Sequence, residues 1–390
     1  MKMYMIDIKK IVFIITDYGS FNNFLGDVAV ALRQKKIGVY VISSPTKVIK
    51  INDKYDYKKE GILFYNVNMP RGFNPLKHLK ASRKIHKLIN EIVPDVVSIH
   101  FTTGIFTTTF IGRLKTKTIG TFHGLGYPVL DSILKKYIYK FVEDKCLKNI
   151  DEAWVLNKFD FDLLKSRDLK VPIFQIPTRG LGCNLSVFNP ERFSSKFRSD
   201  LRKSLPINEF DFVIGFTGRY VSFKGFDKVV MAFKILKEEY RLNNIALLLI
   251  GGKDEAHPTG LTTEEEHWLK NNSSVFDIGF SSKVEEYLSI TDLFVFPSEK
   301  EGMPVCIIEA LAMNVPVITA NARGCNDLIE DNVNGILLTV NSAEEIARQI
   351  FKIMQDKNNY NLMKDEISKN RQFLDRKLFV EQQLNFFGGN

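Results

Sequence analysis

The chain has 390 residues, of which 45% are hydrophobic and 25% are charged, with 54 Lys and Arg against 45 Asp and Glu. This composition is that of a globular protein and excludes a disordered or fibrous chain. The length predicts two domains rather than one small binding module. The sequence has no run of about 18 uncharged apolar residues and no signal-peptide core at its start, so we expect a cytoplasmic protein without a membrane span.

Charge is divided unequally between the two halves of the chain. Residues 1–185 contain 30 Lys and Arg and 16 Asp and Glu, a net charge of +14, whereas residues 186–390 have a net charge of −5. A field of one sign attracts polyanions or an anionic membrane surface to the basic half. The 4 cysteines are 19 or more residues apart and form no CxxC pair, which predicts reduced thiols and neither a disulfide framework nor a zinc site.

In the first half, short apolar runs alternate with amphipathic stretches, the pattern of a parallel sheet with helices on both faces. The expected strands are 10–16, 38–44, 62–67, 95–101, 116–123, 152–157 and 173–178. The expected helices are 23–36, 75–92, 131–150, which begins with the N-cap type residue Asp131, and 158–166.

The second half repeats the same alternation after a polar connection rich in Gly and Pro. The expected strands are 211–218, 245–252, 276–280, 293–298, 315–320 and 335–339, and the expected helices are 226–240, 264–270, 283–290, 304–313, 343–355 and 371–387. We therefore predict an α/β protein with two tandem Rossmann-like, doubly wound parallel-sheet domains that face a central cleft. The expected domains are 1–185 and 186–370, with the last helix, in 371–390, returning to the first domain.

The segment GRYVSFKG, residues 218–225, follows the first strand of the second half. Gly218 at the strand end lets the backbone approach a ligand closely, and Arg219 and Lys224 on the same loop are suited to bind a diphosphate. The alternative is a solvated turn with two surface cations.

The segment EGMPVCIIEA, residues 301–310, carries two glutamates that are eight positions apart. Glu309 lies among apolar residues of a predicted helix and is costly to bury unless it has partners, for which sugar hydroxyls are suitable. Pro304 is placed at the first helical turn, whose free N–H groups form an anion site. The alternative for Glu301 and Glu309 is a helix-dipole contact plus a structural ion pair.

These two segments, together with VPVITANARGCNDLIEDNVNGILL at residues 315–338, resemble the family 4 retaining nucleotide-sugar glycosyltransferases, which have the two-domain GT-B fold. The resemblance covers most of residues 210–357. Within the family, the sequence looks most like bacterial enzymes that build capsule, O-antigen and related surface glycans.

The resemblance implies a role for each matching residue. Arg219 and Lys224 would bind the donor diphosphate, Glu309 the ribose hydroxyls and Glu301 a hydroxyl of the donor sugar. The backbone of Gly302, Met303, Pro304 and Val305 would line the sugar and phosphate site, and Gly279 and Phe280 would border the base. Met303 and Pro304 depart from the family's E-G-F-G pattern.

The first half diverges more from the family, although PDVVSIHF at 94–101 and TIGTFHG at 118–124 look like its strand motifs. His123, at the tip of the second of these strands, would contact the donor sugar. Its alternative role is that of a packed strand-end histidine. Gly19 is the candidate for close approach to the phosphates. The resemblance thus gives Arg219, Lys224, Glu301 and His123 as the catalytic set.

The predicted function is the retaining transfer of a hexosyl or N-acetylhexosaminyl unit from a nucleotide diphosphate sugar, UDP in preference to GDP, to a hydroxyl of a lipid-linked glycan. The alternatives are a nucleotide-sugar epimerase on the same fold and a non-enzymatic nucleic-acid binder; we expect no nucleic-acid partner. We expect neither a cofactor nor a metal, and Asp160 and Asp162 are interpreted as a charged helix face.

Two predicted helices give the first half a basic surface. The basic and neighbouring residues are Lys77, His78, Lys80, Arg83, Lys84, His86 and Lys87 in one helix and Lys135, Lys136 and Lys140 in the other. Apolar residues such as Leu76 and Leu134 lie among these charges. The pattern predicts peripheral attachment to the anionic inner face of the cytoplasmic membrane, and the alternative is two solvated helix faces.

Overall fold

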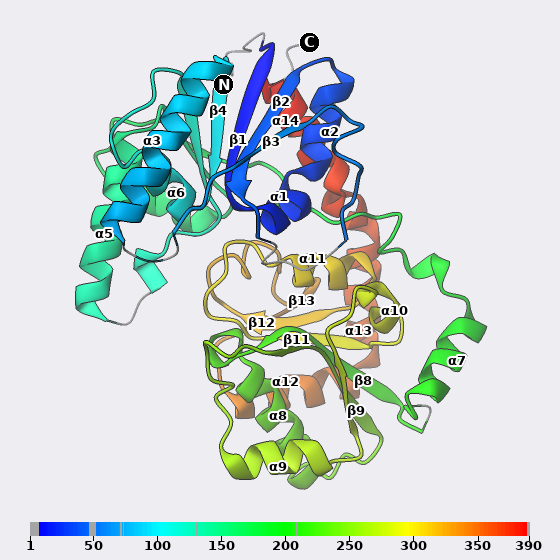
Figure 1. Ribbon diagram of the computed structural model, residues 1–390. Coiled ribbons are helices and arrows are strands. Elements are labelled where there is room, and N and C mark those ends of the chain that lie inside the picture. Colours follow the sequence, from blue (N-terminus) through cyan, green and yellow to red (C-terminus); the bar gives the residue numbers. More distant parts are fainter. Residues whose placement is uncertain are drawn as a thin grey trace. The chain divides into compact units, whose positions relative to one another are not determined.

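A computed structural model of the protein describes residues 8–46, 52–70, 72, 74–129, 132–207 and 209–387. The chain divides into two compact units (Figure 1). The first comprises Met1–Thr178 and Lys377–Asn390, and the second comprises Arg179–Arg376. The two units are described separately below.

The N-terminal unit is built on seven parallel strands in the order β3-β2-β1-β4-β5-β6-β7. The strands are β1 (Lys10–Asp17), β2 (Gly38–Ser44), β3 (Leu63–Asn66), β4 (Val96–His100), β5 (Lys117–Phe122), β6 (Glu152–Val155) and β7 (Ile173–Gln175). Every strand expected in this half is confirmed. Because the strands are parallel, their carboxyl ends lie at one edge of the sheet, and candidate ligand-binding residues follow those ends.

Helices cover both faces of this sheet (Figure 1). They are α1 (Tyr18–Phe24), α2 (Gly26–Gln34), α3 (Pro75–Ile92), α4 (Thr102–Thr108), α5 (Ile133–Lys148), α6 (Lys158–Lys165) and α14 (Arg376–Phe387), with a 3-10 turn at Tyr127–Val129. Alternate residues of β1 face opposite layers. Ile14 shares a core cluster with Ile85 of α3, whereas the Phe13 ring contacts Phe387 of α14 edge to face at 6.2 Å.

The C-terminal unit has six parallel strands in the order β10-β9-β8-β11-β12-β13. They are β8 (Phe212–Tyr220), β9 (Ile245–Lys253), β10 (Val275–Gly279), β11 (Leu293–Phe296), β12 (Val317–Ala320) and β13 (Gly335–Leu338). These strands also confirm the sequence-based expectation. The two sheets therefore have the doubly wound order predicted for each domain.

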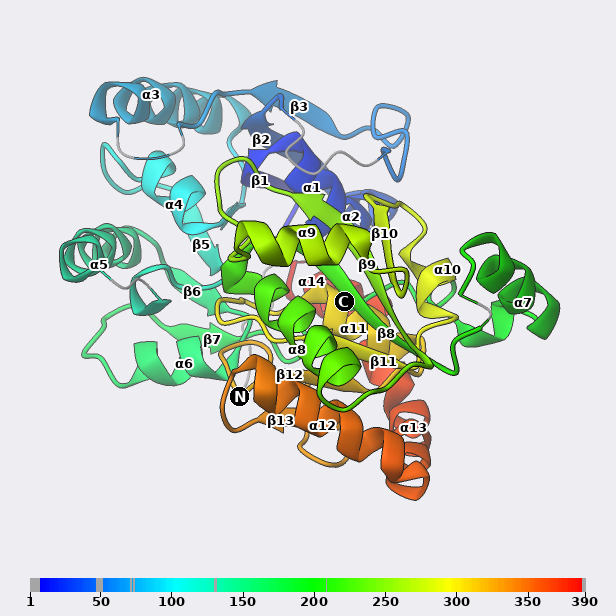
Figure 2. The same ribbon diagram turned by 90° about the horizontal axis from the view of Figure 1, so that it is seen from below.

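The C-terminal helices are α7 (Ser195–Ser204), α8 (Phe226–Glu238), α9 (Thr263–Asn271), α10 (Val284–Leu288), α11 (Val305–Ala312), α12 (Ala343–Gln355) and α13 (Lys357–Asn370). Short 3-10 turns occur at Pro190–Arg192, Ser222–Lys224 and Arg371–Leu374. Figure 2 shows α8 and α12 side by side on one face of the sheet. Buried side chains of both helices share one core with α11 and the central strands.

Three expected helices have wrong bounds, among them 371–387, in which residues 371–374 form a 3-10 turn and α14 begins only at Arg376. Residues 23–36 form no single helix: α1 begins at Tyr18, because Asp17 caps it, and ends at Phe24. The chain then turns at Leu25, and α2 begins at Gly26. At 304–313, Pro304 is the N-cap, so α11 begins one residue later than predicted.

The sequence pattern did not predict α4, α7 or α13, the last of which continues from α12 after a break at Asp356. The residue expected to start α5, Asp131, lies outside the described residues, and the side chain of Ser132 caps this helix. Among the described residues, no helix is long and apolar enough to cross a bilayer.

Candidate active site

In the C-terminal unit, β8 and β9 approach each other closely where the predicted diphosphate loop begins. Gly218 pairs with Gly251 across the two strands, and both have φ of 152°. A Cβ atom at Gly251 would lie 1.8 Å from the Gly218 carbonyl oxygen. The loop after Gly218 therefore depends on a glycine in the neighbouring strand that the motif itself does not contain.

Arg219 lies at the surface of this loop, with its side chain 52% exposed. The guanidinium forms an ion pair with Asp254, which follows β9, and lies 5.4 Å from the centre of the Phe223 ring. Backbone N–H donation by Ala256 and the contact with Arg219 hold the pKa of Asp254 below its usual range. Arg219 is thus partly neutralised and remains accessible to an anion.

Lys224 and Glu301, predicted to bind different parts of the donor, contact each other. The Lys224 ammonium forms an ion pair with Glu301 Oε1, and the two side chains are only 17% and 11% exposed. Ser298 Oγ donates a hydrogen bond of 2.7 Å to the same carboxylate oxygen. Glu301 thereby fixes the position of Lys224, a relation that the linear motif does not contain.

The loop between Glu301 and α11 is held by two residues that sequence reasoning missed. Arg323 Nε donates a 2.9 Å hydrogen bond to the Glu301 carbonyl oxygen. Gly324 has φ of 78°, and a Cβ there would lie 2.6 Å from the Gly302 carbonyl oxygen. Both lie in the RGCNDL segment, which was noted only as part of the family resemblance.

The N-terminus of α11, where the sequence predicts an anion site, lies one residue later than expected. Pro304 caps the helix without a side-chain hydrogen bond, so the first N–H groups, beginning with that of Val305, have no helical partner. The Met303 side chain packs toward Gly180, where a Cβ would lie 2.4 Å from Met303 Cγ. The residue therefore offers mainly its backbone to a ligand.

Glu309 lies within α11, among buried apolar neighbours. Its carboxyl group forms no hydrogen bond or ion pair with any described residue. Burial, reinforced by the charge of Glu285, raises the pKa of Glu309 to about 8. A carboxyl group placed at such cost without a protein partner is suited to accept hydrogen bonds from ligand hydroxyls.

The predicted base-binding position lies at the end of β10. Gly279 has φ of 71°, and its N–H donates a 3.0 Å hydrogen bond to Asp277 Oδ1. Tyr220 donates to the same oxygen at 2.7 Å. The neighbouring Phe280 side chain is 71% exposed, so its ring is available for stacking with a planar group.

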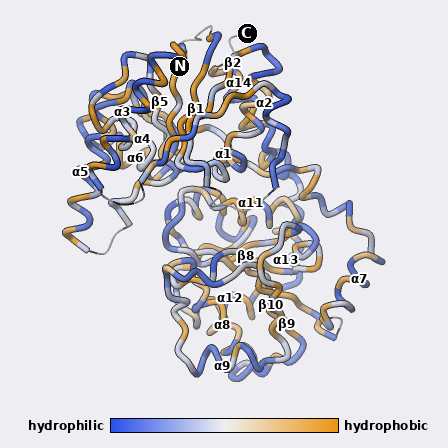
Figure 3. Tube along the Cα trace, viewed as in Figure 1, coloured by the Kyte–Doolittle hydropathy of each residue, from blue (hydrophilic) through white to orange (hydrophobic). Residues whose placement is uncertain are grey.

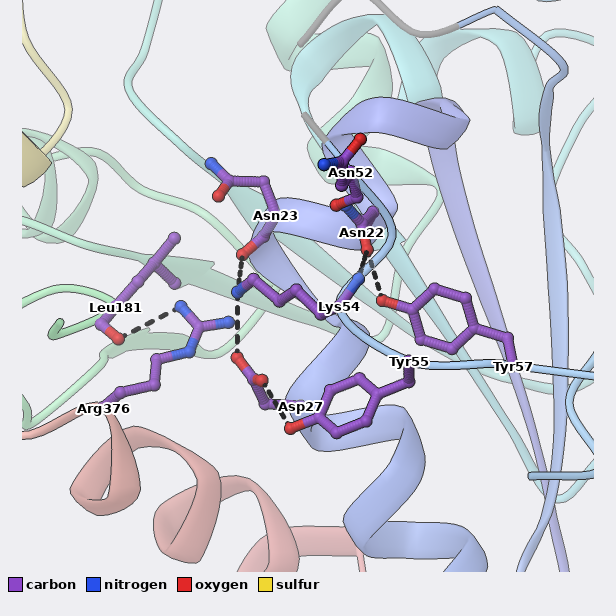
Figure 4. Close-up of polar contacts among 9 residues, drawn as sticks. All are labelled: Asn22, Asn23, Asp27, Asn52, Lys54, Tyr55, Tyr57, Leu181 and Arg376. Atoms are coloured by element: carbon purple, nitrogen blue, oxygen red, sulfur yellow. Dashed lines mark hydrogen bonds and ion pairs between the residues drawn. The ribbon is translucent and has the colours of Figure 1, made fainter. Parts of the chain in front are cut away.

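In the N-terminal unit, Gly19 lies buried in the first turn of α1, directly after β1. Asp17 caps this turn by accepting hydrogen bonds from Ser20 N at 3.0 Å and Ser20 Oγ at 2.8 Å. Figure 4 shows how the segment beginning at Asn52 is held on α1 and α2.

The centre of that contact is Asn22, whose Oδ1 accepts hydrogen bonds from Lys54 N at 3.0 Å and from the Tyr57 hydroxyl at 2.6 Å (Figure 4). A Cβ at Gly26 would lie 2.2 Å from that hydroxyl. The absence of a side chain at Gly26, the first residue of α2, therefore leaves room for Tyr57.

His123 follows the end of β5, as predicted, and its ring is stacked on Phe101 with 4.2 Å between centroids. Its Nε2 lies 3.1 Å from His100 Nδ1, and His100 Nε2 lies 3.1 Å from Ser98 Oγ. Burial lowers the pKa of His123 to about 3, so the ring is neutral. Ser98 and His100 were missed because only the fold brings β4 beside β5.

The interpretation of Asp160 as part of a charged helix face is wrong. Asp160 is buried and accepts 3.0 Å hydrogen bonds from Leu125 N and Asn157 Nδ2. Asp162 does lie on the surface, where it pairs with Lys158 at 2.7 Å. The described residues contain no group of three or more His, Cys, Asp or Glu side chains placed to hold a metal ion.

Comparison with known proteins gives two family matches that together span most of the chain. The model described as "Glycosyl transferases group 1" matches residues 197–371, and "Glycosyl transferase 4-like" matches residues 10–155. The first match contains the Lys224 and Glu301 site, and the second contains His123.

Two curated relatives cover most of their own length. The UDP-Gal:alpha-D-GlcNAc-diphosphoundecaprenol alpha-1,3-galactosyltransferase of Escherichia coli is 24% identical over 310 residues, 77% of each chain. The capsular polysaccharide biosynthesis glycosyltransferase CapM of Staphylococcus aureus is 25% identical over 334 residues, 83% of this chain and 82% of CapM.

Solved structures agree with the fold. HepE of Anabaena, solved with UDP, is 17% identical, with a TM-score of 0.76 over 96% of this chain and 98% of HepE. WaaG, involved in lipopolysaccharide biosynthesis, is 15% identical, with a TM-score of 0.74 over 97% of this chain and 100% of WaaG. The chain belongs to the group 1, family 4-like glycosyltransferases, a retaining family with the GT-B fold, and is homologous to bacterial capsule and surface-glycan enzymes.

Proposed function

We propose that the protein transfers a hexosyl or N-acetylhexosaminyl unit from a UDP-sugar to a hydroxyl of an undecaprenol-linked glycan, with retention of anomeric configuration. The observation that carries the proposal is one site in the C-terminal unit. There Lys224 is fixed by Glu301, no side chain caps the N-terminus of α11, and Glu309 has no hydrogen-bond or ion-pair partner among the described residues. The printed names of two relatives, the Escherichia coli enzyme above and a Campylobacter jejuni N-acetylgalactosaminyltransferase, describe diphosphoundecaprenol-linked acceptors.

In this mechanism the departing diphosphate is the group that needs stabilisation. Lys224, Arg219 and the N–H groups that begin α11 supply fixed positive charge, which is worth more as negative charge develops on the leaving oxygen. Glu301 accepts a hydrogen bond from the donor sugar, and Glu309 accepts hydrogen bonds from the ribose. The acceptor hydroxyl attacks on the face that the diphosphate leaves, and its proton passes to the leaving phosphate oxygen as the bond between the sugar and that oxygen breaks. No covalent glycosyl-enzyme forms.

Thermal stability in the presence of ligands separates this function from its alternatives. UDP should raise the melting temperature, because a ligand that binds only the folded state stabilises it, whereas a single-stranded oligonucleotide should not. Stabilisation by the oligonucleotide alone would instead support a nucleic-acid binder.

A panel of UDP- and GDP-sugars, incubated with undecaprenyl diphosphate-linked GlcNAc, then tests the reaction. We expect transfer from a UDP-sugar to give an α-linked product when the donor is α-configured. A donor that is converted to its epimer without any transfer would support the epimerase and contradict the proposal.

The lipid-linked acceptor implies contact with a membrane, for which α5 is the proposed surface. Its large apolar side chains are exposed to solvent: Ile133, Leu134, Tyr137, Ile138, Tyr139 and Phe141. Leu134 and Tyr137 are 70% and 71% exposed. The side chains of Lys135 and Lys136 between them form no ion pair with described residues, and Figure 3 shows both hydropathy extremes along this helix. Such a surface fits an anionic bilayer.

The other basic helix, α3, contributes less than its sequence suggested. His78 is buried, with Nδ1 3.0 Å from Thr107 Oγ1 and Nε2 3.0 Å from the Gly72 carbonyl oxygen. His86 Nε2 lies 3.0 Å from the Thr108 carbonyl oxygen. Since the apolar side of α3 faces the core, its exposed cations supply only electrostatic attraction.

Co-sedimentation with vesicles tests the membrane surface. Binding should require anionic lipid, and L134S/Y137S should weaken it at least tenfold, because burying one such side chain contributes about 1.5–3 kcal/mol. Leu362→Ser, on the exposed face of α13, is the matched control and should bind normally.

Replacing Lys80, Arg83, Lys84 and Lys87 with Glu should weaken the binding further and reduce its dependence on salt. Binding to neutral vesicles as strong as that to anionic ones, or equal binding by both α5 and α13 variants, would reject α5 as the contact surface.

A further inference from the structure

Ser98, His100 and His123 form a continuous hydrogen-bonded chain from β4 to the end of β5. Ser98 Oγ lies 3.1 Å from His100 Nε2, and His100 Nδ1 lies 3.1 Å from His123 Nε2. Ser98 and His100 are only 2% and 3% exposed. Both nitrogens of His100 and Nε2 of His123 have one partner each, whereas His123 Nδ1 forms no hydrogen bond with a described residue.

The hydrogen bonds of Ser98, His100 and His123 determine which nitrogen of each ring carries the proton. Each neutral imidazole carries a single N–H, and burial lowers the pKa of both rings, His123 to about 3. Ser98 Oγ has no hydrogen-bond acceptor among the described residues except His100 Nε2. If that nitrogen carried the proton, the buried Ser98 hydroxyl would be left without an acceptor, which costs free energy.

With the Ser98 proton directed at His100 Nε2, the remaining positions follow. His100 must carry its proton on Nδ1 and donate it to His123 Nε2. His123 must then carry its own proton on Nδ1. The unused nitrogen of His123 is therefore a hydrogen-bond donor and has no lone pair with which to act as a base.

Neighbouring aromatic rings fix the plane in which this donor lies. Phe101 stacks on His123 with an interplanar angle of 28°, and Phe24 contacts it with 5.4 Å between centroids. Phe101 has φ of 66°, a strained conformation for a bulky residue that persists only where its surroundings require it. The ring is thus held both by hydrogen bonding along its edge and by packing on its face.

We propose that Ser98 and His100 are positioning residues that hold His123 in the Nδ1–H tautomer, so that His123 donates a hydrogen bond to an oxygen of the sugar donor and does not act as a base. The last step rests on the proposed function, because the oxygen belongs to a substrate hydroxyl or phosphate. The tautomer itself depends only on the protein.

Nitrogen NMR of the full chain labelled with ¹⁵N-histidine tests the tautomer without substrate. The chain has 6 histidines, so the signals of His100 and His123 are assigned from the spectra of His100→Gln and His123→Gln. We expect both rings to show a protonated Nδ1 and an unprotonated Nε2. A protonated Nε2 on His123 would overturn the proposal.

Two variants of Ser98 with the same shape test the positioning role. Ser98→Thr keeps the hydroxyl and Ser98→Val removes it, so kcat/KM of the Val variant should be about tenfold below that of the Thr variant, the loss expected for one hydrogen bond. The Nδ1–H signal of His123 should weaken only in the Val variant. Equal spectra and equal kinetics for the two variants would contradict a role for Ser98.

If the buried site does not accept a larger residue, Ser98→Ala replaces the Val variant and wild type replaces the Thr variant. The predicted tautomer together with normal turnover of His123→Gln would refute the substrate contact while leaving the proposed glycosyl transfer intact. Failure of the wild-type enzyme to transfer from any UDP-sugar, with the tautomer as predicted, would instead refute the proposed function.

Discussion

The candidate ligand-binding side chains are charged in the C-terminal unit and neutral in the N-terminal unit. In the C-terminal unit, Lys224 is paired with Glu301 and Arg219 with Asp254. In the N-terminal unit, His123 is a neutral ring bonded to a second neutral ring. The cations of the C-terminal unit are therefore suited to stabilise negative charge that develops on a ligand. The N-terminal unit instead offers a directional hydrogen bond from a neutral group.

The comparison predicts the largest functional loss at Lys224. Lys224→Ala should lower kcat by about 10²–10³-fold, because removing one preorganised group that stabilises transition-state charge has effects of that size. Steady-state kinetics should show the loss mainly in kcat rather than in the KM of the donor.

Lys228→Ala is the matched control for Lys224→Ala. Lys228 lies one turn further along, on α8, and pairs with Glu299 at 2.7 Å. The Lys228→Ala variant therefore loses a similar ion pair. Its kcat should stay within about threefold of wild type, since exposed ion pairs contribute little. Near-normal turnover of Lys224→Ala would remove the diphosphate role from this residue.

A second prediction concerns Glu309, which should act on nucleotide affinity rather than on turnover. Glu309→Gln should weaken binding of UDP-glucose about 10–100-fold at pH 8, because hydrogen bonds to a charged acceptor contribute about 1.5–3 kcal/mol. The pKa of about 8 leaves much of the free carboxyl group protonated at pH 7, and ribose hydroxyls favour the ionised form. Wild-type affinity should therefore rise between about pH 6 and pH 8.

Isothermal titration calorimetry at several pH values measures this dependence. UDP-glucose is the probe because its diphosphate does not titrate in this range. Glu309→Gln should show no such rise, and an unchanged pH dependence in the variant would assign the titration to another group.

The same group predicts a pH-dependent difference in stability. Burial raises the folded-state pKa of Glu309 above its ordinary value of 4.5, so the folded state retains a proton that the unfolded chain has lost. Stability of the wild type therefore falls relative to Glu309→Gln as pH rises from about 4.5 to about 8. Urea unfolding should find the variant more stable at pH 8 and equal to wild type near pH 4; the opposite trend would contradict the burial of this carboxyl group.

Arg219 should show a smaller effect than Lys224, because its side chain is 52% exposed, against 17% for Lys224. Arg219→Ala should lower kcat about three- to tenfold, in keeping with the modest energy of solvent-screened charges. Asp254→Asn leaves Arg219 in place without its partner and should keep kcat at or above the wild-type value. A loss in Arg219→Ala as large as that in Lys224→Ala would show that substrate binding buries the guanidinium.

The sequence predicts those features of each unit that depend on local pattern. The strands, and helices such as 75–92 and 343–355, follow from local periodicity and caps, and the structure places them at the expected residues. The C-terminal site is visible in the sequence because its groups lie on two loops with fixed spacing. Their mutual pairing, as between Lys224 and Glu301, is a tertiary contact that spacing does not encode.

The features that the sequence did not predict depend on which side of an element is buried or on contacts between elements that are distant in the sequence. Asp160 carries the same charge as Asp162, but one faces the core and the other faces solvent. Periodicity alone did not indicate that His78 would lie on the buried side of α3. The bond between His100 and His123 requires β4 and β5 to pair in register, which no local pattern specifies.

The smallest effect is expected from removal of divalent metal. In the proposed mechanism Lys224, Arg219 and the N–H groups that begin α11 meet the charge of the diphosphate, so no bound metal is needed for that role. Treatment with EDTA should change kcat by less than about twofold, on the scale of a negligible barrier change. Asp162→Asn should also leave kcat unchanged, because Asp162 forms a surface ion pair with Lys158 and no other among the described residues. Activity that is lost in EDTA and restored by manganese or magnesium would show that the C-terminal cations alone do not stabilise the leaving group, and a matching loss in Asp162→Asn would identify where the metal binds.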